Sequence, residues 1–190
     1  KILEYKEKHP MGWLSEEDLK SGKKSYWWNW NVATSLNVVI DGLEYVFGTG
    51  GLHAAARGVY ETTELKKVKT VDVSSYYPNL AIKNHTHPEH LGESFCDIYE
   101  GLYNERKKHD KKSPINAMLK LALNGTYGAS NDQYSPLYDP KFTMMITING
   151  QMSLCMLIEK LIVVDGLEIV MVNTDGLEYV VPTEYEHLAE

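Results

Sequence analysis

Three short segments of the sequence carry side chains that could bind metal ions and phosphates. The first is VDVSSYYPN, in which Asp72 follows a β-rich run and precedes a turn that contains two serines and Pro78. A carboxylate at the end of a strand can hold a metal ion while the backbone amides after it face a phosphate, so the segment suits a nucleotide site. Considered alone, it is explained better as a turn in which aspartate and serine form local hydrogen bonds.

The second segment, KLALNGTYG, lies in a helical run. Counted along the helix, four polar side chains are predicted to share one face, namely Asn116, Lys120, Asn124 and Tyr127. The same count predicts four apolar residues on the opposite face, namely Met118, Leu119, Ala122 and Leu123. A lysine on the polar face can neutralise a triphosphate, and the tyrosine, with Gly125 and Gly128, leaves room for a base pair to stack. An ordinary solvated helix face is the alternative, but it leaves the tyrosine and the glycines unexplained.

The third segment, VMVNTDGLEYVV, places Asp175 in a turn between two apolar strands. The string DGLE occurs three times, at Asp41, Asp165 and Asp175, and turns explain the first two adequately. The third is distinguished by the strand LEIVMV before it and by the need for a second carboxylate beside Asp72. Two carboxylates on neighbouring strands can hold two cations about 4 Å apart, one of which lowers the pKa of an attacking hydroxyl while the other stabilises a leaving pyrophosphate.

A fourth cluster, NHTHPEH, could imitate a zinc site. It contains His85, His87 and His90, and Cys96 follows nearby. The spacing fits no standard zinc finger, and histidines in loops are usually solvated, so we expect no zinc ion here. The two cysteines, Cys96 and Cys155, lie far apart without CxxC spacing and are expected to be ordinary thiols.

The elements that must position these segments are a mixture of strands and helices. Two apolar runs joined by Asp41 and Gly42 predict a hairpin, a glycine-rich turn (GTGG) follows, and a strand ends at Asp72. A helix is expected from about residue 143 to residue 162, before the final hairpin. This order predicts an α+β fold, with an antiparallel sheet, helices packed on one face and a short helical projection.

Two consecutive helices make up the predicted projection. Ser94 is expected to cap the first, whose apolar residues recur at helical spacing, namely Phe95, Ile98, Tyr99 and Leu102. Basic residues crowd its C-terminal end, namely Arg106, Lys107, Lys108, Lys111 and Lys112. Ser113 and Pro114 start the second helix, which is expected to run to Gly128.

Composition sets wider limits on the class of protein. At 190 residues, with 43% hydrophobic and 24% charged residues, the chain is long enough for one folded domain with its own core. The net charge of −7 argues mildly against strong non-specific DNA binding, so local charge clusters must account for any nucleic-acid contact. No apolar run is long enough to span a bilayer and the N-terminus does not resemble a signal peptide, so we expect a cytoplasmic protein.

Together and in this order, the three segments resemble the signature motifs of B-family DNA polymerases, especially the compact phage enzymes, over about residues 47–182. DVSSYYPN resembles the first motif (DxxSLYPS), KLALNGTYG the second (KxxxNSxYG) and VNTDG the third (YxDTDS). GTGG is similar to the glycine-rich segment that touches the template strand, and YDPKFTMMITINGQ to the palm helix between the second and third motifs. The resemblance implies a polymerase palm with short helical-hairpin fingers. It also implies template-directed addition of deoxynucleotides to a primer 3′-hydroxyl by two-metal phosphoryl transfer.

The resemblance implies four regions. Residues 1–47 form a tryptophan-rich N-terminal region and a hairpin leading into the palm, residues 48–93 the first part of the palm, residues 94–128 the fingers helices and residues 129–190 the second part of the palm. No segment resembles a proofreading exonuclease or a thumb, so we expect a fragment of a larger polymerase or one piece of a split enzyme. The implied partners are primer-template DNA, deoxynucleoside triphosphates and a separate thumb or exonuclease segment, without a membrane, in the host cytoplasm if a phage encodes the chain.

Matched position by position, the resemblance implies a role for each site residue. Two Mg²⁺ ions are held by Asp72, Asp175 and the backbone of Val73. The incoming nucleotide is bound by the residues that follow the first aspartate, by a fingers arginine and by the second motif, namely Ser74, Ser75, Tyr76, Tyr77, Arg106, Lys120, Asn124 and Tyr127. Within this set, Tyr77 blocks a ribose 2′-hydroxyl, Arg106 binds the γ-phosphate and Tyr127 lies under the nascent base pair. The template strand is contacted by Gly48, Gly50 and Gly51.

The sequence departs from the family pattern at two positions. Asn173 stands where the family usually has the first carboxylate of the third motif, which leaves Asp175 as the more direct ligand. Asp110 stands where a second fingers lysine is often found, so Lys107 or Lys111 must take that role. The alternative class is a truncated or degenerate palm, which binds nucleic acid or a partner subunit without adding nucleotides.

Overall fold

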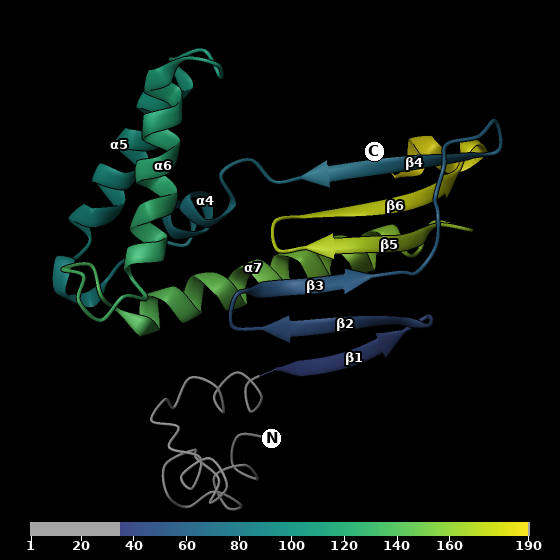
Figure 1. Ribbon diagram of the computed structural model, residues 1–190, viewed down its shortest axis with the longest axis horizontal. Helices are drawn as coiled ribbons and strands as arrows, with labels where there is room; N and C mark the ends of the chain where they lie inside the picture. Colours follow the sequence, from purple (N-terminus) through teal and green to yellow (C-terminus); the bar gives the residue numbers. More distant parts are fainter. Residues whose placement is uncertain (1–34, 190) are drawn as a thin grey trace, which may run out of the picture.

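A six-stranded sheet forms the centre of the structure. The computed structural model describes residues 35–189, and its strands are β1 (Leu36–Ile40), β2 (Leu43–Gly48), β3 (Gly51–Ala55), β4 (Lys66–Asp72), β5 (Glu168–Asn173) and β6 (Gly176–Pro182). The strand order is β1-β2-β3-β5-β6-β4, and every pairing is antiparallel (Figure 1). The predicted α+β fold with an antiparallel sheet is therefore confirmed. Residues 1–34, which include the tryptophan-rich stretch of the predicted region 1–47, lie outside the described residues.

Tight turns join neighbouring strands. Asp41 and Gly42, between β1 and β2, have φ angles of 51° and 81°, both positive as in the type I′ turn that hairpins favour. Two-residue turns also join β2 to β3 (residues 49–50) and β5 to β6 (residues 174–175). The hairpins predicted at these first and last positions are confirmed, whereas no strand was predicted for β3, which begins at the last glycine of the glycine-rich turn GTGG.

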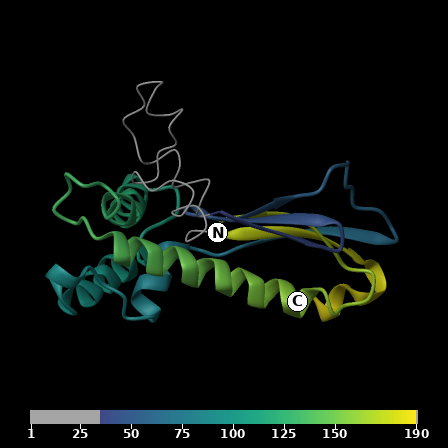
Figure 2. The same cartoon turned by 90° about the horizontal axis from the view of Figure 1, so that it is seen from below.

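Helix α7 (Pro140–Leu161) lies along one face of the sheet, as Figure 2 shows. The side chain of Asp139 caps it by accepting a hydrogen bond from the Phe142 N–H at 3.0 Å, and Pro140 follows at the first helical position. This cap begins the helix three residues before the predicted position 143. Because strand side chains alternate between faces, one face of the sheet is apolar and packs on α7. The shared core includes Leu43, Tyr45, Leu52, Leu154, Ile158, Leu161, Val172, Leu177 and Tyr179.

Three further helices stand at one end of the sheet (Figure 1). They are α4 (Tyr76–Lys83), α5 (Ser94–Lys107) and α6 (Pro114–Ala129), accompanied by short 3₁₀ segments η1 (Glu89–Leu91) and, at the other end of the sheet, η2 (Thr183–Leu188). Helices α5 and α6 run side by side as the predicted projection, and a second core fastens it to α7 through Ala81, Ile82, Tyr99, Leu123, Phe142 and Ile146. None of the described helices is long and apolar enough to cross a membrane.

The buried face of α5 differs from the predicted one. Ile98 is 65% exposed, because the buried stripe passes through Cys96 and Tyr99 and leaves Ile98 on the solvent side. Ser94 is not the N-cap either, since Glu93 takes that position and the Ser94 hydroxyl donates to the Leu91 carbonyl at 3.5 Å. The predicted helix is confirmed, but its cap and one of its four core positions are wrong.

The faces predicted for α6 are wrong in part. Leu119 and Leu123 are buried on the same side as Asn116, whereas Met118 is 61% exposed. The reason is geometric, because Leu123 follows Asn116 by about two helical turns and so lies almost above it. The start of α6 is as predicted, since the Ser113 hydroxyl accepts from the Asn116 N–H and Pro114 occupies the first turn. The helix ends at Ala129, one residue after the predicted Gly128.

Candidate active site

The end of β4 and the β5–β6 turn meet at one edge of the sheet, where the two predicted metal ligands lie. In the strand register Asp72 faces Gly176, the residue after Asp175, and the Val73 N–H donates to the backbone carbonyl of Asp175 at 2.9 Å. A Cβ atom on Gly176 would lie 2.7 Å from the Val71 carbonyl oxygen and 3.3 Å from Oδ1 of Asp72. The predicted proximity of the strand exit and the hairpin tip is therefore confirmed.

Neither carboxylate is paired with a cation among the residues that the structure describes. Within residues 35–189, neither Asp72 nor Asp175 forms an ion pair or a side-chain hydrogen bond. Burial raises the pKa of Tyr76 to about 12, and the negative charge of Asp175 contributes to that rise. The pKa of Tyr77 is also raised, chiefly by burial, then by Tyr127 and by the same aspartate. The edge therefore concentrates negative charge that a bound cation would neutralise.

The donor atoms at this edge fit Mg²⁺. No cluster of three or more histidine, cysteine, aspartate or glutamate side chains suited to a metal exists among the described residues, so a cation bound by Asp72 and Asp175 would need main-chain oxygens as further ligands, of which the Val73 carbonyl is the predicted one. Mg²⁺ prefers oxygen ligands, and it is usually bound by one or two carboxylates together with water and substrate phosphates. Two aspartates and a carbonyl match that set of ligands.

The histidine-rich segment lies in the connection between α4 and α5 and makes local contacts. His90 Nε2 is 2.8 Å from the Pro136 carbonyl oxygen. Cys96 is buried, and its thiol donates to the Thr86 carbonyl at 3.6 Å. These groups are engaged with backbone carbonyls, which accounts for the packing of the segment against its neighbours.

The first motif continues into the N-terminus of α4. Ser75 is the N-cap, has a φ of 52° and makes no side-chain capping bond. Its carbonyl accepts from the Asn79 N–H at 2.9 Å, and the Asn79 side chain donates to the Ser74 carbonyl at 2.8 Å. The first amides of a helix have no partner within it and attract anions, so the segment that follows Asp72 presents donors suited to a phosphate.

A stacked tyrosine pair connects the first and second motifs. The rings of Tyr77 and Tyr127 lie with centroids 4.0 Å apart and planes at 21°. The Tyr77 hydroxyl donates to the Gly50 carbonyl at 2.8 Å, and the Tyr127 hydroxyl lies 2.8 Å from Oγ1 of Thr147 on α7. Both rings are thus held at their hydroxyl ends, which fixes the orientation of the residue predicted to select the sugar.

The glycine-rich turn is anchored to the helices around it. Besides the Tyr77 contact, the Gln151 side chain on α7 donates to the Gly48 carbonyl. A Cβ on Gly51 would lie 3.0 Å from the Thr174 side chain, whereas one on Gly50 would meet nothing within 4 Å. Close packing therefore explains Gly51, and the template contact predicted for the three glycines stays a prediction. Gln151 carried no sequence signal beyond its place in the segment that resembles the palm helix.

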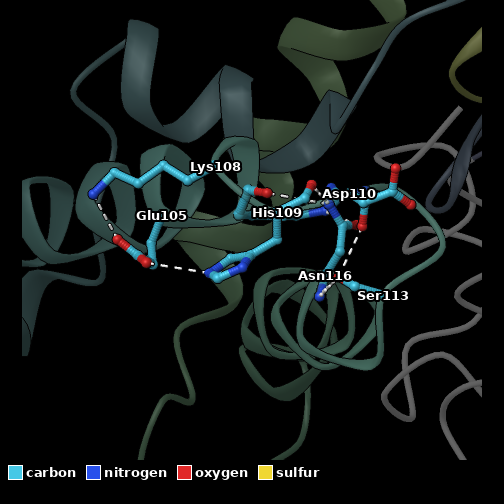
Figure 3. Close-up of polar contacts among 7 residues, drawn as sticks. Glu105, Lys108, His109, Asp110, Ser113 and Asn116 are labelled. Atoms are coloured by element: carbon cyan, nitrogen blue, oxygen red, sulfur yellow. Dashed lines mark hydrogen bonds and ion pairs between the residues drawn. The ribbon is translucent and has the colours of Figure 1, made fainter.

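Arg106 reaches from α5 to the first motif. Its Nη1 donates to the Ser75 hydroxyl at 2.7 Å, and its Nε donates to Oδ1 of Asn116 at 3.1 Å. The Asn116 amide donates in turn to the carbonyls of Arg106 and His109, at 3.1 Å and 3.0 Å. Figure 3 shows Asn116 inside the α5–α6 turn, near Asp110 and Ser113. Asn116 is only 6% exposed, so it is an internal support for Arg106.

The other predicted residues of the fingers lie on the surface. Lys120 and Asn124 are exposed on α6 and form no hydrogen bond or ion pair within the part of the chain that the structure describes. Lys107 lies 4.3 Å above the ring centroid of Tyr103. Asp110 accepts from the Lys112 N–H at 2.8 Å and so stabilises the α5–α6 turn. The roles predicted for these residues toward a nucleotide stay predictions.

Comparisons with known proteins find distant structural likeness to solved structures. No protein-family model matches the chain, and no curated protein matches its sequence. Among solved structures, the chain is similar to the family B DNA polymerase from the hyperthermophilic archaeon Pyrobaculum calidifontis, with a TM-score of 0.42 and 16% identity. The similarity covers 70% of this chain and 24% of the archaeal chain, so this chain spans about a quarter of that protein. At this distance, any function must be inferred from the geometry of the site.

Proposed function

We propose that the chain is the palm and fingers core of a template-directed DNA polymerase, which adds deoxynucleotides to a primer 3′-hydroxyl by two-metal phosphoryl transfer. The observation that supports it best is that Asp72 and Asp175, neither paired with a cation among the described residues, lie on adjacent segments at one sheet edge beside the N-terminus of α4. Mg²⁺ bound there supplies two effects, a lower pKa for the attacking hydroxyl and neutralisation of charge on the leaving pyrophosphate.

In this proposal the chain's own groups bind and orient the triphosphate. Asp72, Asp175 and the Val73 carbonyl hold the ions, and the amides of residues 74–76 accept the phosphates at the helix N-terminus. Arg106 already points at this turn through its bond to the Ser75 hydroxyl. Its planar guanidinium is suited to a bidentate contact with the γ-phosphate, while Lys120 and Asn124 add donors from α6.

The stacked tyrosines are proposed to select the nucleotide. Tyr127 lies under the nascent base pair, and the ring of Tyr77 occupies the space that a ribose 2′-hydroxyl requires. A fixed ring discriminates better than a mobile one, because it cannot move aside at low cost. The stacking and the hydroxyl contact with Gly50 supply that rigidity. The turn around Gly48, Gly50 and Gly51 is proposed to contact the template strand.

Primer-template DNA and deoxynucleoside triphosphates are the proposed partners. With a net charge of −7, the chain has little positively charged surface that could bind the phosphates of a duplex. A separate thumb or exonuclease segment is therefore proposed to supply further DNA contacts. Activity would then be measured best at low salt, where few phosphate contacts suffice.

A non-catalytic palm that binds nucleic acid or a partner subunit is the second candidate. Asn173 favours it, because an amide replaces the carboxylate that the resembling motif usually carries at this position. Asn173 is exposed at the end of β5 and faces His53 and Gly176 in the strand register. With one carboxylate fewer, the edge would hold a metal ion more weakly.

Primer extension at low salt in Mg²⁺ separates the two candidates. We expect Asp72→Asn and Asp175→Asn each to lower nucleotide addition by at least about 100-fold. Asp41→Asn is the matched control, because Asp41 heads an identical DGLE string in a turn at the opposite end of the sheet. Extension that survives both site substitutions would contradict the proposal. A wild-type chain that stays inactive with a supplied thumb would favour the non-catalytic palm.

Sugar selection gives a second test. We expect Tyr77→Ala to incorporate ribonucleotides, because the ring no longer fills the space of the 2′-hydroxyl. Tyr77→Phe is the control, since it keeps the ring and loses only the hydroxyl contact with Gly50. The ratio of ribonucleotide to deoxynucleotide incorporation is measured for each variant. An unchanged ratio in Tyr77→Ala would count against the role assigned to this residue.

A further inference from the structure

The turn that carries Asp175 has a strained backbone at the preceding residue. Thr174 has a φ of 59°, and the Asp175 N–H donates to the Asn173 carbonyl across it at 2.6 Å. Three-residue turns with a positive φ at the centre are rare, and the left-handed region is unfavourable for β-branched residues. Such a conformation persists only where the surrounding structure determines it. The contacts of Thr174 therefore matter for the position of the aspartate.

Three consecutive residues of β3 hold Thr174 in place. The Thr174 N–H donates to the Leu52 carbonyl at 2.9 Å. Its Oγ1 lies 3.0 Å from Nε2 of His53, within hydrogen-bond distance. Its side chain packs directly over Gly51, where a Cβ would approach to 3.0 Å. We refer to Gly51, Leu52 and His53 as the β3 clamp.

The β3 clamp is itself attached to two helices. The turn before it accepts hydrogen bonds from Gln151 on α7, through Gly48, and from Tyr77 on α4, through Gly50. On its other side, the β5–β6 turn is joined to the first motif by the bond from the Val73 N–H to Asp175. The strained turn thus lies between the β3 clamp and the first motif. Among the described residues, His53 is the one residue of β3 whose side chain forms a hydrogen bond with this turn.

We propose that His53 is a positioning residue, which acts through the Thr174 hydroxyl to hold Asp175 in the geometry that binds the metal ion. The proposal rests on the function proposed above. His53 is exposed and lies on the opposite face of β3 from the core residues Leu52 and Ala54, so its removal leaves the packing of the sheet unchanged. Losing its bond releases the side chain of Thr174 and lets the turn relax away from its strained conformation.

Amide hydrogen exchange, measured by NMR on the full chain, tests the clamp without reference to catalysis. We expect His53→Ala and Thr174→Val to raise exchange at Thr174 and Asp175 by about tenfold, the effect of one lost hydrogen bond. Thr174→Ser keeps the hydroxyl and His53→Gln keeps a donor at similar reach, so both should stay close to wild type. His187→Ala removes an exposed histidine from η2, at the other end of the sheet, and serves as the control.

Metal binding and kinetics test the positioning role. In calorimetric titration with Mn²⁺ alone, we expect His53→Ala and Thr174→Val to weaken binding by about tenfold, and the double variant to be no weaker than either. Nucleotide addition should fall in kcat by a similar factor with KM for the nucleotide unchanged, because Asp175 and not the base pair is displaced. Thr174→Ser and His53→Gln should restore both values.

The outcomes separate the positioning role from the proposed function. Unchanged exchange in His53→Ala and Thr174→Val would overturn the clamp. Faster exchange with unchanged Mn²⁺ affinity would show that the turn moves without affecting the ligand, and would overturn the positioning role. A wild-type chain that neither binds Mn²⁺ nor adds nucleotides would overturn the proposed function and with it the positioning role.

Discussion

The sheet edge that carries Asp72 and Asp175, called here the aspartate edge, and the base of the α5–α6 projection use polar side chains in opposite ways. Asn116 is buried, and its donors and acceptor are bonded to Arg106 and His109. Asp72 and Asp175, by contrast, lie on neighbouring segments and are bonded to no side chain that the structure describes. Satisfied polar groups stabilise a fold, and unpaired like charges do not. The difference is that the polar groups at the base of the projection are fixed by one another, whereas the two carboxylates are left for the ligand proposed above.

Strained backbone conformations are also found beside the candidate site. Four described residues other than glycine have a positive φ, namely Asp41, Ser75, His85 and Thr174. Two of these four flank the candidate site, where Ser75 opens α4 and Thr174 precedes Asp175. Strain that concentrates at one edge is typical of functional sites.

Gly176→Ala should have the largest effect on stability at the aspartate edge. The new Cβ would lie 2.7 Å from the Val71 carbonyl oxygen, so β4 and β6 must separate where they pair. We expect a loss of about 3 kcal/mol in the free energy of unfolding, measured in urea, together with lost nucleotide addition. Gly125→Ala is the control, because a Cβ there meets nothing within 4 Å. Equal stability of the two variants would contradict the close approach of the strands.

Asn116→Ala tests the base of the projection. It leaves the Nε of Arg106 and two carbonyls without their partner, so we expect a loss of about 2 kcal/mol in the free energy of unfolding. Because Arg106 also loses its support, KM for the nucleotide should rise more than kcat falls. Asn131→Ala, at an exposed position after α6, is the control. A variant with wild-type stability would show that the asparagine does not brace the helices.

Much of the fold could be predicted from local signals. Turn residues such as Asp41 and Gly42 and the Ser113–Pro114 start of α6 determine backbone conformation within a few positions, and each of them is confirmed. The buried faces of the helices were harder to predict, because which residues of a helix are buried depends on the helices packed against it. The tertiary packing of α5 and α6 leaves Ile98 exposed and brings Leu123 to the buried side.

The candidate site also has a part that could be predicted from the sequence and a part that could not. Motif order was enough to predict that the end of β4, which carries Asp72, and the β5–β6 turn, which carries Asp175, would lie side by side. The supporting contacts could not be predicted, since Asn116 with Arg106, Gln151 with Gly48 and His53 with Thr174 join residues whose pairing no local pattern encodes. Such bonds depend on the assembled sheet and helices. A single sequence gives the ligands of a site more readily than the residues that orient them.

Alkaline pH should lower the free energy of unfolding through a buried tyrosine in each region, by less than the two substitutions above. Burial raises the pKa of Tyr76, in α4 next to the aspartate edge, to about 12 from 10.0, and it raises the pKa of Tyr99, in the projection, as well. Because the folded state retains these protons longer than the unfolded state, stability is complete below pH 10 and falls as pH rises toward 12. We expect each tyrosine to account for about 1 kcal/mol of the fall in the free energy of unfolding between pH 9 and pH 11. Tyr76→Phe and Tyr99→Phe should each flatten this dependence, and an unchanged slope would contradict the burial of that hydroxyl.

Asp72→Asn should change the free energy of unfolding least, although it removes a proposed metal ligand. The side chain is exposed and bonded to no other described side chain, so we expect the free energy of unfolding in metal-free buffer to stay within about 0.5 kcal/mol of wild type. In saturating Mg²⁺ the wild type should gain stability that the variant lacks, because a ligand that binds only the folded state stabilises it by mass action. Urea unfolding with and without Mg²⁺ measures both quantities, and Asp41→Asn should respond to the ion as wild type does. A variant stabilised by Mg²⁺ as strongly as wild type would place the ion elsewhere. A variant much less stable than wild type without the ion would mean that Asp72 is a structural residue like Asn116, and the contrast between the two regions would fail.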